Sequence, residues 1–272
     1  MPPKRRAIAP WLIAGVVVLA IAAFFLWRNA QQPEPVIAQA PPVPVQTAPQ
    51  PAPEPEIKHP IELVPTEPLP RPEPLPPRAE SDAALVEVMT ALVGSSAMTQ
   101  FFAPDELVRR FVTTVDNLPR ESLPMRVRAV AAVPGGFTVT GPESERSIHA
   151  DNARRYEPFV RFVETLDAKK LVSIYVHFYP LLQEEYRSLG FPTKHFNDRV
   201  VEAIDDMLSA PQPQEPIALV QPKVMYRFAD PELEGLSAGR KIMIRIGTDN
   251  AQRLKAKLRE IRLVLAGPAR TR

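Results

Sequence analysis

Residues 11–27 read WLIAGVVVLAIAAFFLW, an apolar run without a charged or strongly polar side chain. A helix of this length rises about 25 Å, slightly less than the roughly 30 Å hydrocarbon core of a membrane. Trp11 and Trp27 are suited to the two interfaces, and Arg28 can reach water along its aliphatic stem. The run therefore predicts a retained transmembrane anchor at residues 11–28.

The charges around this run predict its orientation. Basic residues occupy positions 4–6. Because cytoplasmic flanks are rich in Lys and Arg, residues 1–10 are expected in the cytoplasm and the C-terminal part in the periplasm, across a bacterial inner membrane. A cleaved signal peptide is the alternative. The run is longer than the usual ~7–15 residues, however, and the cleavage-like Ala38-Gln39-Ala40 precedes an unfavourable Pro41.

Residues 29–80 are predicted to form a disordered, proline-rich linker. Residues 33–80 contain 17 of the 34 prolines. Proline fixes φ and lacks an N–H, so a semi-rigid polyproline-II spacer is expected in place of helix or sheet. About 46 such residues at ~3.1 Å each reach roughly 140 Å, far enough to hold a domain well away from its anchor. The alternative role is a ligand for a proline-binding module, through residues 65–77.

Composition excludes thiol chemistry and argues against a nucleic-acid partner. The chain has no cysteine, which removes disulfides and thiol catalysis. The formal charge is only +2, and four cations belong to residues 1–32. The sequence therefore lacks a nucleic-acid footprint, and no nucleic-acid partner is predicted.

Residues 81–266 have the periodicity of a mainly α globular domain, and residues 267–272 are predicted to be a disordered tail. Apolar residues recur at spacings of three and four, which predicts about seven helices. These helices fall near residues 81–93, 104–118, 152–166, 168–189, 193–209, 237–246 and 248–265.

Three local features refine this fold class. Ser81 is expected to N-cap the first helix, and Asp167 the longest one. Pro180 is expected to kink the longest helix or divide it into two. A short β-hairpin is predicted near residues 126–140, where two extended runs flank Pro134-Gly135-Gly136.

The sequence lacks the usual motifs of hydrolases, nucleotide-binding proteins and zinc proteases, so no catalytic residue, metal ligand or cofactor is predicted. Two weaker patterns stay open. His195, Asp198 and Glu202 share a helix face with metal-like spacing, but further ligands would have to come from elsewhere. Glu184-Glu185 could provide a general acid for glycan cleavage if a partner carboxylate were found.

A polar surface around the break at Pro180 and Gly190-Phe191-Pro192 is the candidate binding site. It consists of Tyr179, Gln183, Asn197, Asp198 and Arg199. The competing interpretation is that these side chains cap and connect helix ends, which is the commonest role of such residues.

The last helix, near residues 248–265, combines an apolar stripe with several cations. Its stripe predicts a helix docked on the core, with the cations as a solvated face. The alternative is a basic surface for anionic lipid headgroups. The cations are Arg253, Lys255, Lys257, Arg259 and Arg262.

Two long strings identify a resemblance. Residues 179–199 contain YPLLQEEY, LGFP and FNDR, and residues 228–241 read FADPELEGLSAGRK. Together they resemble the proteobacterial domain of unknown function 3014 family, over about residues 82–265. The resemblance implies a membrane-anchored envelope protein of Gram-negative bacteria, and it assigns no activity or site. The layout is also similar to the energy-transducing TonB proteins, but residues 12–26 lack the polar groups expected of a TonB membrane helix.

The sequence thus favours a non-enzymatic, inner-membrane-tethered binding or scaffolding protein of the cell envelope. Its expected partners are the inner membrane and either peptidoglycan or another envelope protein. The alternative is a tethered periplasmic hydrolase acting on cell-wall glycan.

Overall fold

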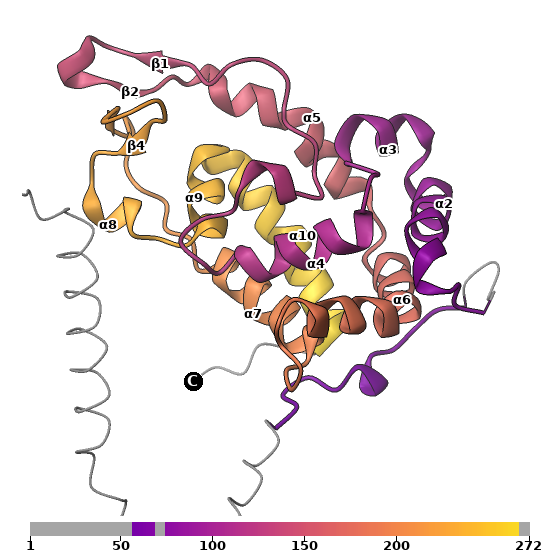
Figure 1. The fold of residues 1–272 in the computed structure, drawn as a ribbon. Helices are drawn as coiled ribbons and strands as arrows, with labels where there is room; N and C mark the ends of the chain where they lie inside the picture. The colour runs from indigo at the N-terminus through magenta and orange to yellow at the C-terminus, as the bar shows by residue number, and fades with distance from the viewer. Residues whose placement is uncertain (1–55, 69–73, 267–272) are drawn as a thin grey trace, which may run out of the picture. The chain divides into compact units, whose positions relative to one another are not determined.

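The described part of the computed structural model, residues 56–68 and 74–266, is mainly helical (Figure 1). The predicted anchor with Trp11, Trp27 and Arg28, most of the predicted linker and the predicted tail lie outside the described residues. The α-helices of the described part are α2 (Ser81–Val93), α3 (Ser95–Phe101), α4 (Leu107–Asn117), α5 (Asp151–Thr165), α6 (Ala168–Ser188), α7 (Phe196–Leu208), α8 (Pro231–Glu234), α9 (Ala238–Arg245) and α10 (Thr248–Ala266). All seven predicted helices are present, and α3 and α8 are additional short ones.

The chain turns sharply between α2 and α3. Gly94 has φ +85°, a conformation that glycine adopts without a Cβ penalty, and it both ends α2 and precedes α3. The expectation that Ser81 caps α2 is wrong. Ser81 is the first helical residue, and its Oγ donates a hydrogen bond to the carbonyl of Arg78 in the preceding 3₁₀ turn, Arg78–Glu80.

Helix α4 receives its cap from another helix. Glu106, just before it, is left-handed (φ 52°) and makes no side-chain cap. The Asp82 carboxylate of α2 accepts a hydrogen bond from Val108 N at 2.8 Å instead. This bond satisfies one of the amides that a helix start leaves without a partner, and it ties α4 to α2.

Helix α6 is the longest element, and it continues through Pro180 as one helix. Asp167 caps it as predicted, accepting hydrogen bonds from Lys169 N and Lys170 N. Division into two helices is therefore wrong. Pro180 is exposed, so water can serve the carbonyl that its ring leaves unbonded. The helix ends before Gly190 (φ 102°), as the glycine predicts.

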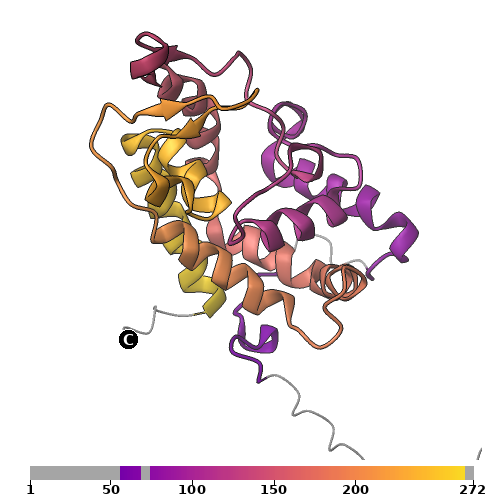
Figure 2. The same cartoon turned by 60° about the vertical axis from the view of Figure 1, so that its left-hand side comes forward.

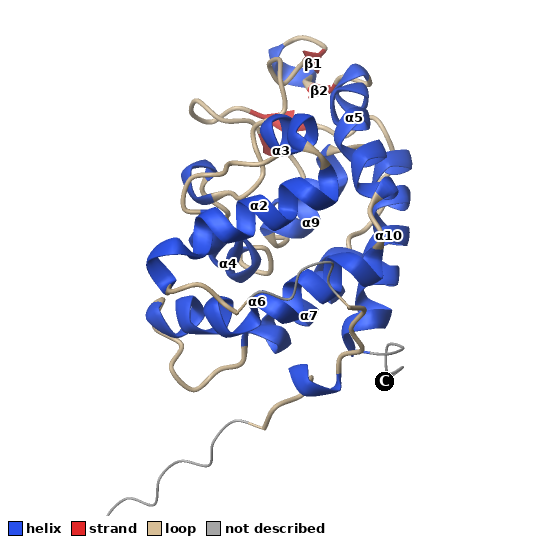
Figure 3. Cartoon of the chain, turned by 90° about the vertical axis from the view of Figure 1, so that its right-hand side faces the viewer, coloured by secondary structure: helices blue, strands red, loops and turns tan. Residues whose placement is uncertain are grey.

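The β structure consists of two short antiparallel pairs. Strand β1 (Val139–Thr140) pairs with β2 (Ser147–Ile148), and β3 (Leu219–Val220) pairs with β4 (Arg227–Phe228). A bridge between Ser147 and Ala218 joins the pairs. Figures 2 and 3 place them at the end of the helical body opposite residues 56–68.

The two extended runs of the hairpin predicted near residues 126–140 do not pair with each other. Residues 125–127 form a 3₁₀ turn, and Val130 bridges to Phe102. The second extended run pairs onward to β2 instead. Arg155 of α5 fixes the intervening Gly-rich turn, since its guanidinium donates to the carbonyls of Pro134 and Gly135.

The main hydrophobic core lies among α2, α4, α6 and α7. Phe178, Phe196, Val112, Val172 and Val201 are each at most 2% exposed. Helix α10 packs against α5, α6, α7 and α9 and contributes Leu265 to this core. In residues 56–68 and 74–266, no single helix is long and apolar enough to cross a membrane. Within the same described residues, one helix pair at residues 78–93 and 95–101, bent by 115°, is long and apolar enough when the two helices are taken together.

Candidate functional site

The predicted binding residues lie on α6 and at the start of α7, which brings them together. Their hydrogen bonds and ion pairs are made with other groups of the same chain. Tyr179 OH donates to Gln183 Oε1 at 2.9 Å, and the same oxygen accepts a hydrogen bond from Phe196 N at 2.7 Å. Gln183 Nε2 donates to the carbonyl of Lys194 at 2.9 Å. Gln183 is buried and holds the connection between the two helices in place.

Asn197 and Asp198 bind a segment that lies far away in the sequence. Asn197 Nδ2 donates to the carbonyl of His59 at 2.8 Å. The Asp198 carboxylate accepts hydrogen bonds from His59 N at 2.7 Å and Lys58 N at 3.2 Å. The first turn of α7 therefore binds the backbone of residues 58–59.

We call residues 56–68 the strap. Beyond His59, Val64 of the strap is 8% exposed and belongs to the main core, and Glu67 N donates to Ser173 Oγ of α6 at 2.8 Å. Burying one valine contributes at most about 1.5–3 kcal/mol. The strap lies within the range predicted as linker, so packed structure starts before Ser81.

One signal in the sequence could have revealed the strap. Residues 56–64, EIKHPIELV, contain a single proline in an otherwise proline-rich region and four large aliphatic residues. Such a run offers more apolar surface to bury than a proline-rich stretch does. Ser173 of α6 and Asp116 of α4 carry no comparable signal, because their partners lie far away in the sequence.

Arg199, the fifth predicted residue, belongs to an internal ion-pair cluster. Its Nε lies 3.1 Å from Asp116 Oδ1, and its Nη1 lies 2.8 Å from a carboxylate oxygen of Glu202. Arg120 reaches the other oxygen of Asp116 at 2.8 Å. The Asp116 and Arg199 side chains are only 9% and 14% exposed, so this pair joins α4 to α7 at a largely buried position, with Arg120 and Glu202 at its outer side.

These contacts also use the side chains that the sequence considered for metal binding. Asp198 is bound to the strap and Glu202 to Arg199, while His195 precedes α7 without a side-chain cap. Within residues 56–68 and 74–266, no group of three or more His, Asp or Glu side chains is arranged to hold a metal ion.

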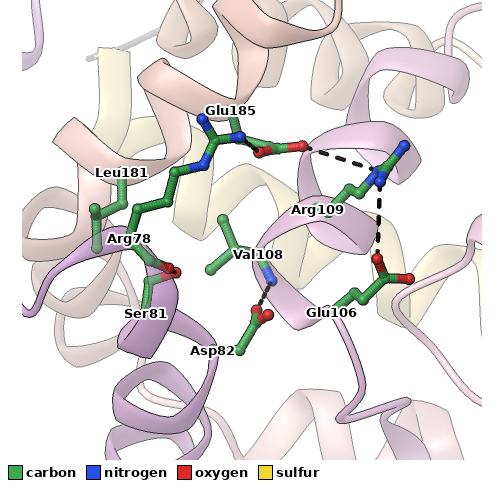
Figure 4. Close-up of a pocket in the computed structure, with 8 residues that line it drawn as sticks. All are labelled: Arg78, Ser81, Asp82, Glu106, Val108, Arg109, Leu181 and Glu185. Carbon is green, nitrogen blue, oxygen red and sulfur yellow. Dashed lines mark hydrogen bonds and ion pairs between the residues drawn. The ribbon is translucent and has the colours of Figure 1, made fainter.

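A pocket of about 210 Å³ lies between α2, α4 and α6 (Figure 4). Glu185 projects between the guanidinium groups of Arg78 and Arg109, as Figure 4 shows. Its Oε2 lies 2.5 Å from Arg78 Nη2, and its Oε1 lies 4.0 Å from Arg109 Nε. The pocket is lined by Arg78, Ser81, Asp82, Glu106, Val108, Arg109, Leu181 and Glu185.

The carboxylates of this pocket have structural partners. Asp82 caps α4, Glu106 lies 3.7 Å from Arg109, and Glu185 pairs with Arg78. Glu184, the neighbour of Glu185, is 55% exposed and pairs with Arg78 at 3.3 Å. The pocket thus offers ion pairs in place of the proton donor and separate carboxylate that glycan cleavage requires.

The prediction that the cations of α10 form a solvated basic face is wrong for three of them. Lys255, Lys257 and Arg262 are each less than 10% exposed. Lys255 Nζ donates to the carbonyl of Ala210, just after α7, at 2.6 Å, and burial lowers the pKa of this lysine. Arg262 pairs with Asp205 of α7.

Lys257 has the same role at the end of another helix. Its Nζ donates to the carbonyl of Leu166, which ends α5, at 2.9 Å. Because a helix C-terminus leaves carbonyls without partners and carries negative partial charge, a buried cation is favourable there. Arg253 pairs with Glu164, and Arg259 is exposed. The lipid-binding face considered from the sequence therefore does not form.

The tyrosines around the predicted surface provide a test of its burial. Burial raises the pKa of Tyr175 well above its ordinary value, raises that of Tyr179, and raises that of Tyr186 to about 12. A raised pKa means that the folded state holds the proton more tightly. Its stabilising contribution is therefore complete below about pH 10 and lost as pH rises toward 12.

We expect these three side chains to ionise only above pH 10 while the protein stays folded. A titration by tyrosinate absorbance, compared with one in strong denaturant, measures this. Full ionisation of all five tyrosines near pH 10 in the folded protein would contradict the burial of this surface.

The described part of the chain is thus a mainly α domain in which polar side chains at helix ends bind the protein's own backbone. The chain belongs to a family described as protein of unknown function (DUF3014), whose model matches residues 107–262, more than half of the sequence. This match confirms the resemblance given by residues 179–199 and 228–241. No curated protein and no solved structure shows significant similarity to the chain.

Proposed function

We propose that this protein is a non-enzymatic binding or scaffolding module, tethered to the bacterial inner membrane and acting in the periplasm. The apolar residues 11–27, the basic residues 4–6 and the proline-rich spacer support the tether. One observation carries the binding role. The surface of α6 and α7 holds a separate stretch of polypeptide, residues 58–67, through its backbone.

Exposed apolar side chains support a partner-binding role. Leu63 on the strap is 78% exposed, and Val224 and Met225 between β3 and β4 are 84% and 68% exposed. Single exposed apolar residues are ordinary, but exposed neighbours at the end of a hairpin are typical of contact surfaces. The ion-paired pocket does not favour the alternative, a tethered hydrolase of cell-wall glycan.

Photo-crosslinking in living cells tests this proposal. A photoreactive amino acid replaces Leu63 or Val224 in the full-length protein, and crosslinked species are identified. We expect a defined envelope protein or peptidoglycan fragment at one of these positions. The matched control replaces Val112, which is 0% exposed and should capture nothing.

Two results would contradict the proposal. Recovery of no envelope protein or glycan from either position would refute the scaffold role. Release of the protein from washed membranes, or a shortened mature form, would refute the retained anchor.

A further inference from the structure

We propose that the strap occupies an exchangeable peptide-binding surface. In the resting protein the strap covers this surface, and a proline-flanked segment of a partner protein binds there when the strap leaves. This surface consists of Ser173 on α6 and Asn197 and Asp198 on α7. The inference deepens the proposed binding function and rests on it.

The strap is recognised mainly through backbone groups. Lys58 N, His59 N, the His59 carbonyl and Glu67 N all bond to side chains of this surface. Every polypeptide presents such groups, and here the chain bends at Lys58 and His59 and forms one 3₁₀ turn at Ile61–Leu63. Polar side chains that bind backbone groups allow a surface to accept a segment from another chain.

Few strap side chains are needed for binding. Val64 is buried in the main core, whereas Leu63 beside it is 78% exposed and Ile57 is 42% exposed. Pro60, which precedes the 3₁₀ turn Ile61–Leu63, and Val64, which follows it, both have extended backbones. Ile61 is partly buried and also packs against the main core. The surface therefore requires a segment with two apolar anchors, the first inside the 3₁₀ turn and the second just after it, a pattern that other chains can supply.

The surface residues are held in place without the strap. Asn197 Oδ1 accepts a hydrogen bond from Tyr175 OH at 3.1 Å, and Ser173 Oγ donates to the carbonyl of Lys169 at 2.9 Å. Neither hydrogen bond involves the strap. A preformed site loses little conformational entropy on binding, so departure of the strap leaves a competent surface.

The family match covers the surface in this contact but not the strap that binds it. Residues 107–262 include the whole surface, whereas the strap lies outside the matched range. The recognisable domain thus supplies the receptor, and the segment that covers it belongs to the proline-rich region. Because the strap belongs to the same chain, its binding is intramolecular and it masks the surface from weak ligands.

The test uses the full chain in two forms and a labelled synthetic peptide with the sequence of residues 56–68. The Val64→Asp chain places a charge in the core position of its own strap, which should release it. We expect this chain to bind the peptide at least ten-fold more tightly than the unmodified chain, measured by fluorescence anisotropy. Circular dichroism confirms that the Val64→Asp chain stays folded.

Matched peptides and a receptor variant locate the binding. A peptide with Val64→Asp should bind at least ten-fold more weakly, whereas one with Leu63→Asp, altered at the exposed neighbour, should bind within two-fold of the original. Asp198→Ala in the Val64→Asp chain should weaken binding at least five-fold. Equal binding by both chains, or equal loss from both altered peptides, would overturn the proposal.

Hydrogen exchange on the unmodified chain provides a second measurement that does not depend on a variant. If the strap opens by itself, the amides of Lys58, His59 and Glu67 exchange at least about 100-fold faster than that of Phe196. Equal protection would show that the strap is an integral part of the fold and would overturn the proposal. Failure to capture an envelope partner in cells would refute the proposed function, and the peptide measurements would still decide whether the surface exchanges.

Discussion

Substituting Asp116→Ala is expected to lower the free energy of unfolding by about 3 kcal/mol, because it removes one partner of a largely buried ion pair. Arg199, whose side chain is 14% exposed, would lose the carboxylate at 3.1 Å and keep only the backbone carbonyl of residue 116 and the exposed Glu202. Arg120, which is half-exposed, can turn to water and adds less. Urea denaturation of the full chain, followed by circular dichroism, measures the change as a lower midpoint at an unchanged slope.

The control is an ion pair on the surface. Glu157 and Arg161 are one helical turn apart on α5, and their charged groups lie 2.8 Å from each other. Both side chains are substantially exposed. Glu157→Ala should cost less than about 0.5 kcal/mol. If Asp116→Ala costs no more than this, Arg199 is not committed to the fold, and the binding role considered from the sequence becomes the better account of it.

Substituting Gln183→Leu is expected to cost about 2–6 kcal/mol of unfolding free energy, because it leaves two backbone groups without a partner at about 1–3 kcal/mol each. The groups are Phe196 N and the Lys194 carbonyl, both close to the α6–α7 connection. Leucine has a similar volume, so the loss reports hydrogen bonding more than packing. The same urea titration measures it.

Two variants separate this effect from general disturbance. Gln252→Leu, at an exposed position of α10, should change stability by less than about 0.5 kcal/mol. Tyr179→Phe removes only one donor to Gln183 and should cost about 0.5–1.5 kcal/mol. A Gln183→Leu variant as stable as the Gln252→Leu variant would show that the connection finds other partners.

Most helices could be predicted because their signals are local. The apolar spacing of α6, its cap at Asp167 and its end before Gly190 all lie within a few residues of the helix. The pairing of β1 was not predictable in this way. Its partner depends on how Arg155 holds the preceding turn, and Arg155 comes from a different element.

The residues of the candidate site lie close together, and the structure shows their polar groups bound to other parts of the same chain. The sequence marks Asn197 and Asp198 as polar residues at a helix start, which is compatible with a cap or a binding site. Their actual partners, Lys58 and His59, lie about 140 positions away in a proline-rich region. Local sequence patterns cannot predict a contact between residues that lie so far apart in the chain.

The sequence by itself determined the helical class, the ends of the long helices, the family and the expectation of an N-terminal membrane anchor, because each depends on neighbouring residues. Only the tertiary structure decided which charges are buried and what they bind. Lys255 and Lys257 have the spacing of a solvated face, yet packing brings them to carbonyls at the ends of α7 and α5. Burial of a charge is favourable only where packing supplies such a partner. The strap likewise depends on packing, which brings its backbone groups to the side chains of Ser173, Asn197 and Asp198.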